Sequence, residues 1–94
     1  MPTLHIEHEI TDFPTWSVAF AGFADVRSRS GVRQEVVRRA VDDERWIVID
    51  LTFDTAGEAA QFLGFLRTNV WGTPLAPALA GPATAKVLED VPTS

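Results

Sequence analysis

Residues 45–53 carry the pattern that most constrains how this chain can fold. Large apolar side chains occupy every second position, namely Ile47, Ile49, Leu51 and Phe53, and the positions between them hold Trp46, Val48, Asp50 and Thr52. Successive side chains of a β-strand point to opposite faces of a sheet. The alternation therefore predicts a strand with one face in a core and the other face more polar.

Three further segments are expected to join this strand in a sheet. Residues 3–10 alternate in the same way, with Leu4, Ile6 and Ile10 on one face and His5, Glu7 and Glu9 on the other. Residues 32–40 are typical of an extended strand, and the acidic run at residues 42–44 predicts a tight turn from it into residues 45–53. Residues 84–91 are predicted to form a last short strand.

A first helix is predicted between the first two strands. Aromatic and aliphatic side chains recur every three or four residues over residues 16–26, which is the spacing of one helix face. Thr11 or Asp12 can cap its start. The helix is expected to run to about Ser30, where Gly31 suits a left-handed cap.

A second helix is predicted after the central strand. Thr55 and Glu58 form a capping box, in which each side chain can bond to the other residue's backbone amide. An apolar stripe continues to Val70, and Gly72 is expected to end the helix. Residues 72–83 contain three prolines and are predicted to be a loop.

The resulting element order is β-α-β-β-α-β. Right-handed crossovers and a local hairpin favour a four-stranded antiparallel sheet in the order 4-1-3-2, with both helices on one face. The fold class is therefore predicted to be α+β and ferredoxin-like, as a single domain over residues 1–94.

The face of this sheet away from the helices is expected to be open. It is predicted to carry His5, Glu7, Val37, Trp46 and Val48. A Trp and two Val are unfavourable in water, and the same face of a second copy would cover them. The chain is therefore expected to form a homodimer, as a dimeric α/β barrel.

The whole chain resembles the dimeric α/β-barrel superfamily, the antibiotic biosynthesis monooxygenase-like proteins. The resemblance lies in its length, its element order and the stretch Phe62-Leu-Gly-Phe-Leu-Arg followed by the proline-rich loop. It implies a pocket between the helices and the sheet or inside the barrel. Members include cofactor-free oxygenases, lactone isomerases and haem-degrading enzymes that bind iron through a His on the second helix. Residues 55–71 contain no His, so haem is disfavoured. No cofactor is expected.

These observations predict a protein that binds a small hydrophobic or aromatic compound. The resemblance implies a cofactor-free oxygenase or isomerase, although the quinone-forming oxygenases of this type use Tyr, Trp and Asn, and this chain has no Tyr and only Asn69. The alternative is a non-catalytic ligand-sensing or dimeric interaction module. His8 is the candidate catalytic base, with Trp16 and Trp46 as candidate substrate-binding residues. Hydrogen-bonded packing in the core competes with catalysis as the role of His8.

His5, Glu7 and Asp50 are a second candidate set for substrate binding, on the open face. Carboxylates in a partly dry space could exchange protons with a substrate. They could instead form interface ion pairs with Arg33, Arg39 or the second copy. His5 and His8 would project from opposite faces of their strand and cannot share a metal ion. His5 and Glu7, with Asp50 from the adjacent strand, share a face and could form a site, but a metal ion is not expected.

Composition bears on partners and location. Eight basic and thirteen acidic residues give a formal net charge of −5, and there is no cysteine. Phosphate backbones and anionic membrane surfaces attract basic patches, so neither nucleic acid nor membrane is an expected partner. The first twenty residues lack the pattern of a signal peptide, and a cytoplasmic protein is expected.

Overall fold

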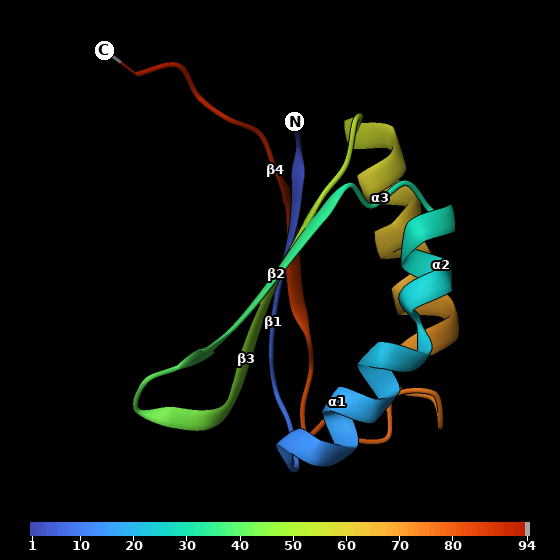
Figure 1. The fold of residues 1–94 in the computed structure, drawn as a ribbon, viewed down its shortest axis with the longest axis vertical. Helices are drawn as coiled ribbons and strands as arrows, with labels where there is room; N and C mark the ends of the chain where they lie inside the picture. The colour runs from blue at the N-terminus through green and yellow to red at the C-terminus, as the bar shows by residue number, and fades with distance from the viewer. Residues whose placement is uncertain (94) are drawn as a thin grey trace.

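The computed structural model of the protein describes residues 1–93 and contains a sheet with helices on one side (Figure 1). The strands are β1 (Thr3–Glu9), β2 (Gln34–Ala40), β3 (Asp43–Thr52) and β4 (Thr84–Leu88). Their order in the sheet is β2-β3-β1-β4, and each neighbouring pair is antiparallel. The predicted α+β ferredoxin-like fold and its strand order are confirmed.

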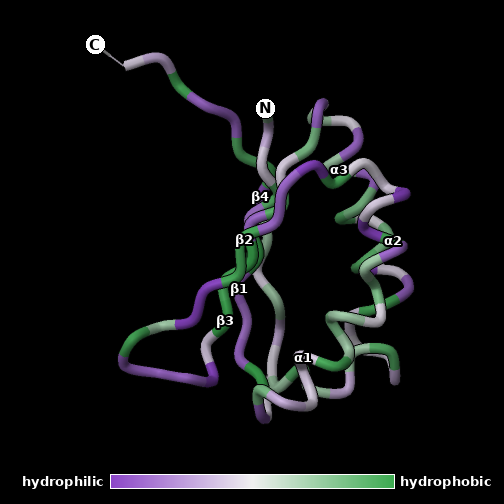
Figure 2. Tube along the Cα trace, viewed as in Figure 1, coloured by the Kyte–Doolittle hydropathy of each residue, from purple (hydrophilic) through white to green (hydrophobic). Residues whose placement is uncertain are grey.

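The helices form one layer over the sheet. They are α1 (Phe13–Gly22), α2 (Ala24–Arg29) and α3 (Ala56–Phe65), and a π-helical turn, η1 (Leu66–Val70), continues α3. Figure 2 shows the turn end of the β2–β3 hairpin projecting away from this layer, and this end is mostly hydrophilic. Over residues 1–93, no helix is long and apolar enough to cross a bilayer.

The prediction of one continuous helix up to Ser30 is wrong, because the helix breaks at Phe23. The carbonyl of Phe20 accepts from the Phe23 amide at 3.1 Å in a three-residue turn and from the Arg27 side chain at 2.6 Å. These bonds interrupt the regular pattern of i to i+4 bonds. The predicted cap at Asp12 is confirmed, since its carboxylate accepts from the Thr15 amide at 2.8 Å.

The predicted turns at the helix boundaries are largely confirmed. Gly31 has a φ of 98°, a left-handed conformation that glycine adopts without steric cost. The Thr55 hydroxyl accepts from the Glu58 amide at 3.1 Å, as the capping box requires. The Glu58 carboxylate bonds to the Thr55 hydroxyl at 3.3 Å rather than to its amide, so only half of the box forms.

The core lies between the helices and the inner face of β1 and β3. The predicted alternation is confirmed, and the largest of the fully buried side chains are Leu4, Ile10, Ile47, Leu51 and Phe53. Ile6, His8 and Ile49 face the helices as well, and the alternate positions of the two strands, which include His5, Glu7, Trp46, Val48 and Asp50, lie on the open face of the sheet. The sheet therefore separates two chemically different surfaces.

The predicted face of Val37 is wrong. Val37 pairs with Ile49 across the ladder, which places it on the helix side, and Val36 pairs with Asp50 on the open face. The sequence does not decide which face of β2 is inward, because Val36 and Val37 are adjacent and either one could face the core. The tight turn also falls one position earlier than predicted, at residues 41–42, and the last strand ends at Leu88 rather than at residue 91.

Candidate functional site

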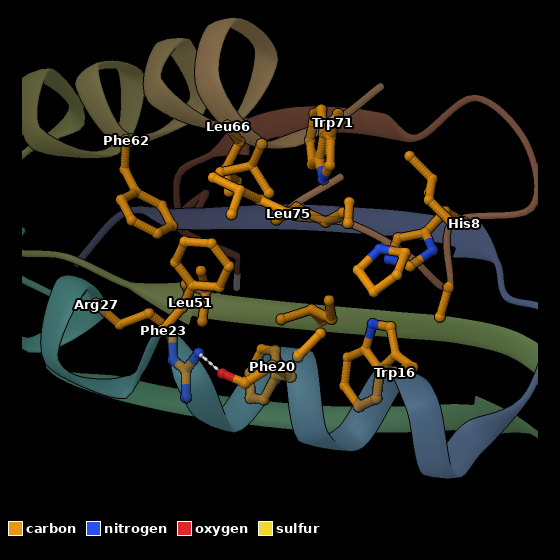
Figure 3. Close-up of a pocket in the computed structure, with 18 residues that line it drawn as sticks. His8, Trp16, Phe20, Phe23, Arg27, Leu51, Phe62, Leu66, Trp71 and Leu75 are labelled. Atoms are coloured by element: carbon orange, nitrogen blue, oxygen red, sulfur yellow. Dashed lines mark hydrogen bonds between the residues drawn. The ribbon is translucent and has the colours of Figure 1, made fainter. Parts of the chain in front are cut away.

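A cavity of about 90 Å³ lies between the helix layer and the sheet. Its walls are almost entirely carbon, and its aromatic lining residues are Trp16, Phe20, Phe23, Phe62 and Trp71. Figure 3 shows these side chains directed toward a common space from opposite sides. A concave apolar space with a few polar groups is the usual form of a small-molecule site.

His8 is a polar group in this apolar lining. The alternation of β1 turns it to the helix side between Ile6 and Ile10, and only 4% of its surface is exposed. Its Nδ1 donates to the carbonyl of Glu9 at 3.2 Å, and we assign the neutral tautomer with the proton on Nδ1 from this bond. Burial lowers the pKa of His8, against a smaller rise from the bond to the Glu9 backbone. His8 is therefore neutral at pH 7.

The second ring nitrogen of His8 is available to a ligand. Within residues 1–93, no protein group bonds to Nε2. Every fully buried side-chain nitrogen and oxygen of these residues has a hydrogen-bond partner, so Nε2 itself keeps some accessible surface. His8 lines the cavity, so its unprotonated Nε2 faces that space. A neutral imidazole nitrogen in this position can accept a proton.

Two indole groups present N–H donors from opposite walls. Trp16 comes from α1, where its ring stacks on Phe20 with centroids 4.8 Å apart. Trp71 follows the π-helical turn, in which its amide bonds to the Leu66 carbonyl at 2.8 Å. In Figure 3 the nitrogen of each indole is turned toward the cavity, and Trp16 lies at the same end as His8. A ligand at that end would lie beside the Trp16 donor and the His8 acceptor.

The proline-rich loop closes the outer side of the cavity. Leu75 lines the space and is 54% exposed, so it lies at the mouth. The later part of the loop is held to the end of β1, where Ala78 accepts from Thr11 at 2.9 Å and the Ala80 amide donates to Glu9 at 3.0 Å. These bonds hold the loop beside His8.

The second candidate set forms a paired network on the open face of the sheet. His5 Nδ1 lies 2.6 Å from an Asp50 oxygen, and Nε2 lies 2.9 Å from a Glu7 oxygen. Glu7 also accepts from the Trp46 indole at 3.0 Å, and Asp50 accepts from Arg38 at 3.2 Å. Hydrogen bonds to Glu7 and Asp50 raise the pKa of His5, and the bonds from His5 and Trp46 lower the pKa of Glu7.

The arginine that joins this network differs from the two that were predicted. Arg33 instead pairs with Asp54 at 2.7 Å, and Arg39 lies over the ring of Phe13. Arg38 reaches Asp50 because its position in β2 places it on the open face.

The structure separates the two sets of predicted site residues. His8 and Trp16 share the cavity, whereas His5, Glu7, Asp50 and Trp46 lie on the opposite face of the sheet. Trp46 does not line the cavity with His8, because adjacent side chains of β3 point to opposite faces and its neighbour Ile47 points inward. Over residues 1–93, no group of His, Cys, Asp or Glu is suited to hold a metal ion. The two ring nitrogens of His5 face different carboxylates, which prevents convergence on one ion.

Sequence reasoning missed the buried Arg27. Only 6% of its surface is exposed, and its guanidinium pairs with Glu35 at 2.6 Å. A signal was present, since Arg27 follows Phe20 and Phe23 at helical spacings of seven and four residues. The π-helical turn that presents Trp71 had no comparable signal.

Solved structures with a similar fold come from several organisms. A protein from Nitrosomonas europaea, provisionally assigned as an antibiotic biosynthesis monooxygenase, has a TM-score of 0.72 at 15% identity over 97% of this chain and 99% of its own. SnoaB, a cofactor-independent oxygenase from Streptomyces nogalater, has a TM-score of 0.72 at 18% identity, covering 98% and 94%. A dimeric ferredoxin-like protein from an uncultured marine organism has a TM-score of 0.60 at 11% identity, covering 100% and 98%.

These structural similarities establish the fold alone. No family model matches the sequence, and no curated protein matches it at a significant level. The predicted resemblance to the monooxygenase-like ferredoxin fold is confirmed at the level of architecture.

Proposed function

We propose that the protein binds a small aromatic or hydrophobic compound in the cavity and that His8 takes a proton from it. The observation that carries this proposal is the Nε2 of the buried His8, to which no protein group of residues 1–93 bonds, in an otherwise apolar space. The reaction class is cofactor-free oxygenation or isomerisation. SnoaB, which has the same fold, is described as a cofactor-independent oxygenase and supports the first of these.

The chemistry follows from the groups that face the cavity. His8 removes a proton from an acidic C–H, and the electron pair delocalises onto a substrate oxygen, where the Trp16 and Trp71 indoles donate to the developing charge. Return of the proton to another carbon is isomerisation. Addition of dioxygen to the carbanion forms a peroxide anion, which takes the proton from His8 to become a hydroperoxide. The hydroperoxide O–O bond then breaks as the remaining hydrogen on that carbon leaves with the terminal oxygen as water, and a carbonyl is left. Because burial makes His8 a weak base, the substrate must be acidified by an adjacent carbonyl or aromatic ring.

The proposal is tested with 4-nitrophenol, whose phenolate absorbs at longer wavelength than its phenol. The bound probe should be more ionised than the free probe at the same pH, because His8 accepts the proton and two indoles stabilise the anion. His8→Ala should abolish this difference. Equal ionisation in the presence of wild-type protein and of His8→Ala would contradict the role of His8.

We also propose that the open face pairs with the same face of a second copy. Val36, Trp46 and Val48 are only half-buried there, and the fold is shared with a protein described as dimeric. Sedimentation velocity should give a dimer, and Val48→Asp should give a monomer. Val18→Asp is a matched control, because Val18 is 75% exposed on α1. A monomeric wild-type protein at high concentration would refute the dimer.

A non-catalytic interaction or ligand-sensing module is the second candidate function. It is favoured by the pairing of His5, Glu7 and Asp50 with one another and with their neighbours, which suits an interface better than proton exchange. The two functions differ in the effect of His8→Ala. Turnover should be lost in an enzyme, whereas only stability should change in an interaction module.

A further inference from the structure

The ion pair between the buried Arg27 and the partly exposed Glu35 lies at one end of a column of stacked side chains. The guanidinium carbon of Arg27 lies 3.7 Å from the centroid of the Phe20 ring. Its Nη1 donates to the carbonyl of the same Phe20 at 2.6 Å, and its Nε donates to Glu35 at 2.6 Å. The Arg27 guanidinium therefore bonds to Glu35 and to the Phe20 carbonyl, and one of its faces lies over the Phe20 ring. Arg27 thus contacts both the ring and the backbone of Phe20.

The column continues from Phe20 to the donor in the cavity. The rings of Phe20 and Trp16 are stacked at 4.8 Å with an interplanar angle of 19°, and Trp16 also contacts Phe13 at 5.8 Å. Figure 3 shows Arg27 at the end of the cavity away from His8. The orientation of the Trp16 ring thus depends on Phe20, and the orientation of Phe20 depends on Arg27.

Glu35 anchors the column from outside the cavity. It lies on β2 with 42% of its side chain exposed, and it accepts from Nε of Arg27 at 2.6 Å and from Nη2 at 3.5 Å. Two bonds from one carboxylate to a planar guanidinium fix the plane of that group as well as its position. The ion pair therefore connects a strand at the surface to the aromatic wall of the cavity.

We propose that Arg27 is a positioning residue for the Trp16 indole N–H, with Glu35 as its anchor. The assignment of a ligand to that N–H rests on the proposed function. Hydrogen bonds prefer a donor angle above about 150° and weaken steeply below about 120°, so a rotation that turns the Trp16 N–H away from a ligand oxygen weakens that bond. Only a planar guanidinium can lie flat on Phe20 and bond to Glu35 with two nitrogens.

Arg27→Met is the informative variant. Met is an unbranched side chain that can fill the site of the Arg27 side chain. Glu35 is 42% exposed and can be hydrated when its partner is removed, so the substitution leaves no buried charge unpaired. The indole N–H resonances of the three Trp residues, assigned with single Trp→Phe variants, report ring orientation without any ligand. The Trp16 resonance should shift and those of Trp46 and Trp71 should not. Arg29→Met, at an exposed position of α2, is the matched control.

Binding of 4-nitrophenol tests the consequence for the ligand. Arg27→Met should weaken binding about fivefold, the size of one lost hydrogen bond between neutral groups, and Arg27→Lys should not restore it. In a Trp16→Phe background, which removes the N–H and keeps the stack, Arg27→Met should have no further effect. Equal effects in both backgrounds would overturn the proposal, as would an unmoved Trp16 resonance. If wild-type protein binds no probe, the proposed function fails, and the resonance alone decides the role of Arg27.

Discussion

The two histidines should give the protein a maximum of stability near pH 6.5, the ordinary pKa of a histidine. Burial lowers the pKa of His8, so below pH 6.5 the unfolded chain binds a proton that the folded chain refuses. Stability therefore falls as the pH falls from 6.5 toward the folded pKa. Hydrogen bonds to Glu7 and Asp50 raise the pKa of His5, which has the opposite effect. Its contribution is complete below pH 6.5 and is lost as the pH rises through the folded pKa.

The slope of the free energy of unfolding against pH has an upper limit both below and above pH 6.5. One proton bound in one state and not in the other changes the free energy of unfolding by about 1.4 kcal/mol per pH unit. The curve of stability against pH has a lower limb, below pH 6.5, due to His8 and an upper limb, above pH 6.5, due to His5. The slope of the His8 limb should come closer to this limit, because His8 is almost fully buried. The limb due to His5 should be shallower, because 30% of its side chain is exposed and solvent screens its partners.

Urea unfolding followed by Trp fluorescence measures these limbs at constant ionic strength. The assay should stay above about pH 5, because Glu7 and Asp12 have lowered pKa values and their contributions are lost in acid. His8→Gln should remove the lower limb and leave the upper one, and His5→Gln should do the reverse. Measurement at two protein concentrations separates any dimer dissociation from unfolding. A lower limb that persists in His8→Gln, or an upper limb that persists in His5→Gln, would refute this reasoning.

Three further substitutions test the fold by chemical denaturation. Ile47→Ala should lower the free energy of unfolding by about 2–5 kcal/mol, because Ile47 is fully buried, whereas Val41→Ala at the exposed hairpin turn should change it by less than about 0.5 kcal/mol. Thr55→Ala should cost about 1 kcal/mol by removing the cap of α3, and Thr55→Ser should restore most of that loss. Gly31→Ala should destabilise by at least about 1 kcal/mol, since φ is 98° and the added carbon would lie 2.5 Å from the Glu58 carboxylate. An unchanged midpoint for Gly31→Ala would show that the turn can adopt another conformation.

Strong alternation and caps made much of the fold predictable. The alternating apolar residues Ile47, Ile49 and Leu51 of β3, continued by Phe53 just after it, leave only one face that can be buried. The inward face of that strand, and by the same pattern that of β1, could therefore be predicted from the sequence. The β2 strand lacked this property, and Val37 was placed on the wrong face. The break at Phe23 could not be predicted either, because it depends on the Arg27 side chain reaching the Phe20 carbonyl.

The candidate site divides in the same way. Local periodicity placed His8 and Trp16 on inward-facing positions, and the structure brings both to one cavity. Trp71 joined them through a π-helical turn, and Arg38 rather than Arg33 or Arg39 completed the network of His5 and Asp50. These pairings depend on the register between strands and on the exact end of a helix, and a single-residue shift changes both.

Sequence alone determined the order of the elements, the inward face of β1 and β3, and the presence of His8 on that face. These features follow from repeats and caps within a few neighbouring residues. The tertiary structure decided which nitrogen of His8 stays free, which indoles face it, and that Arg27 and Glu35 secure the aromatic wall. Such contacts join residues from different elements, and their distances are set only when the helix layer packs on the sheet.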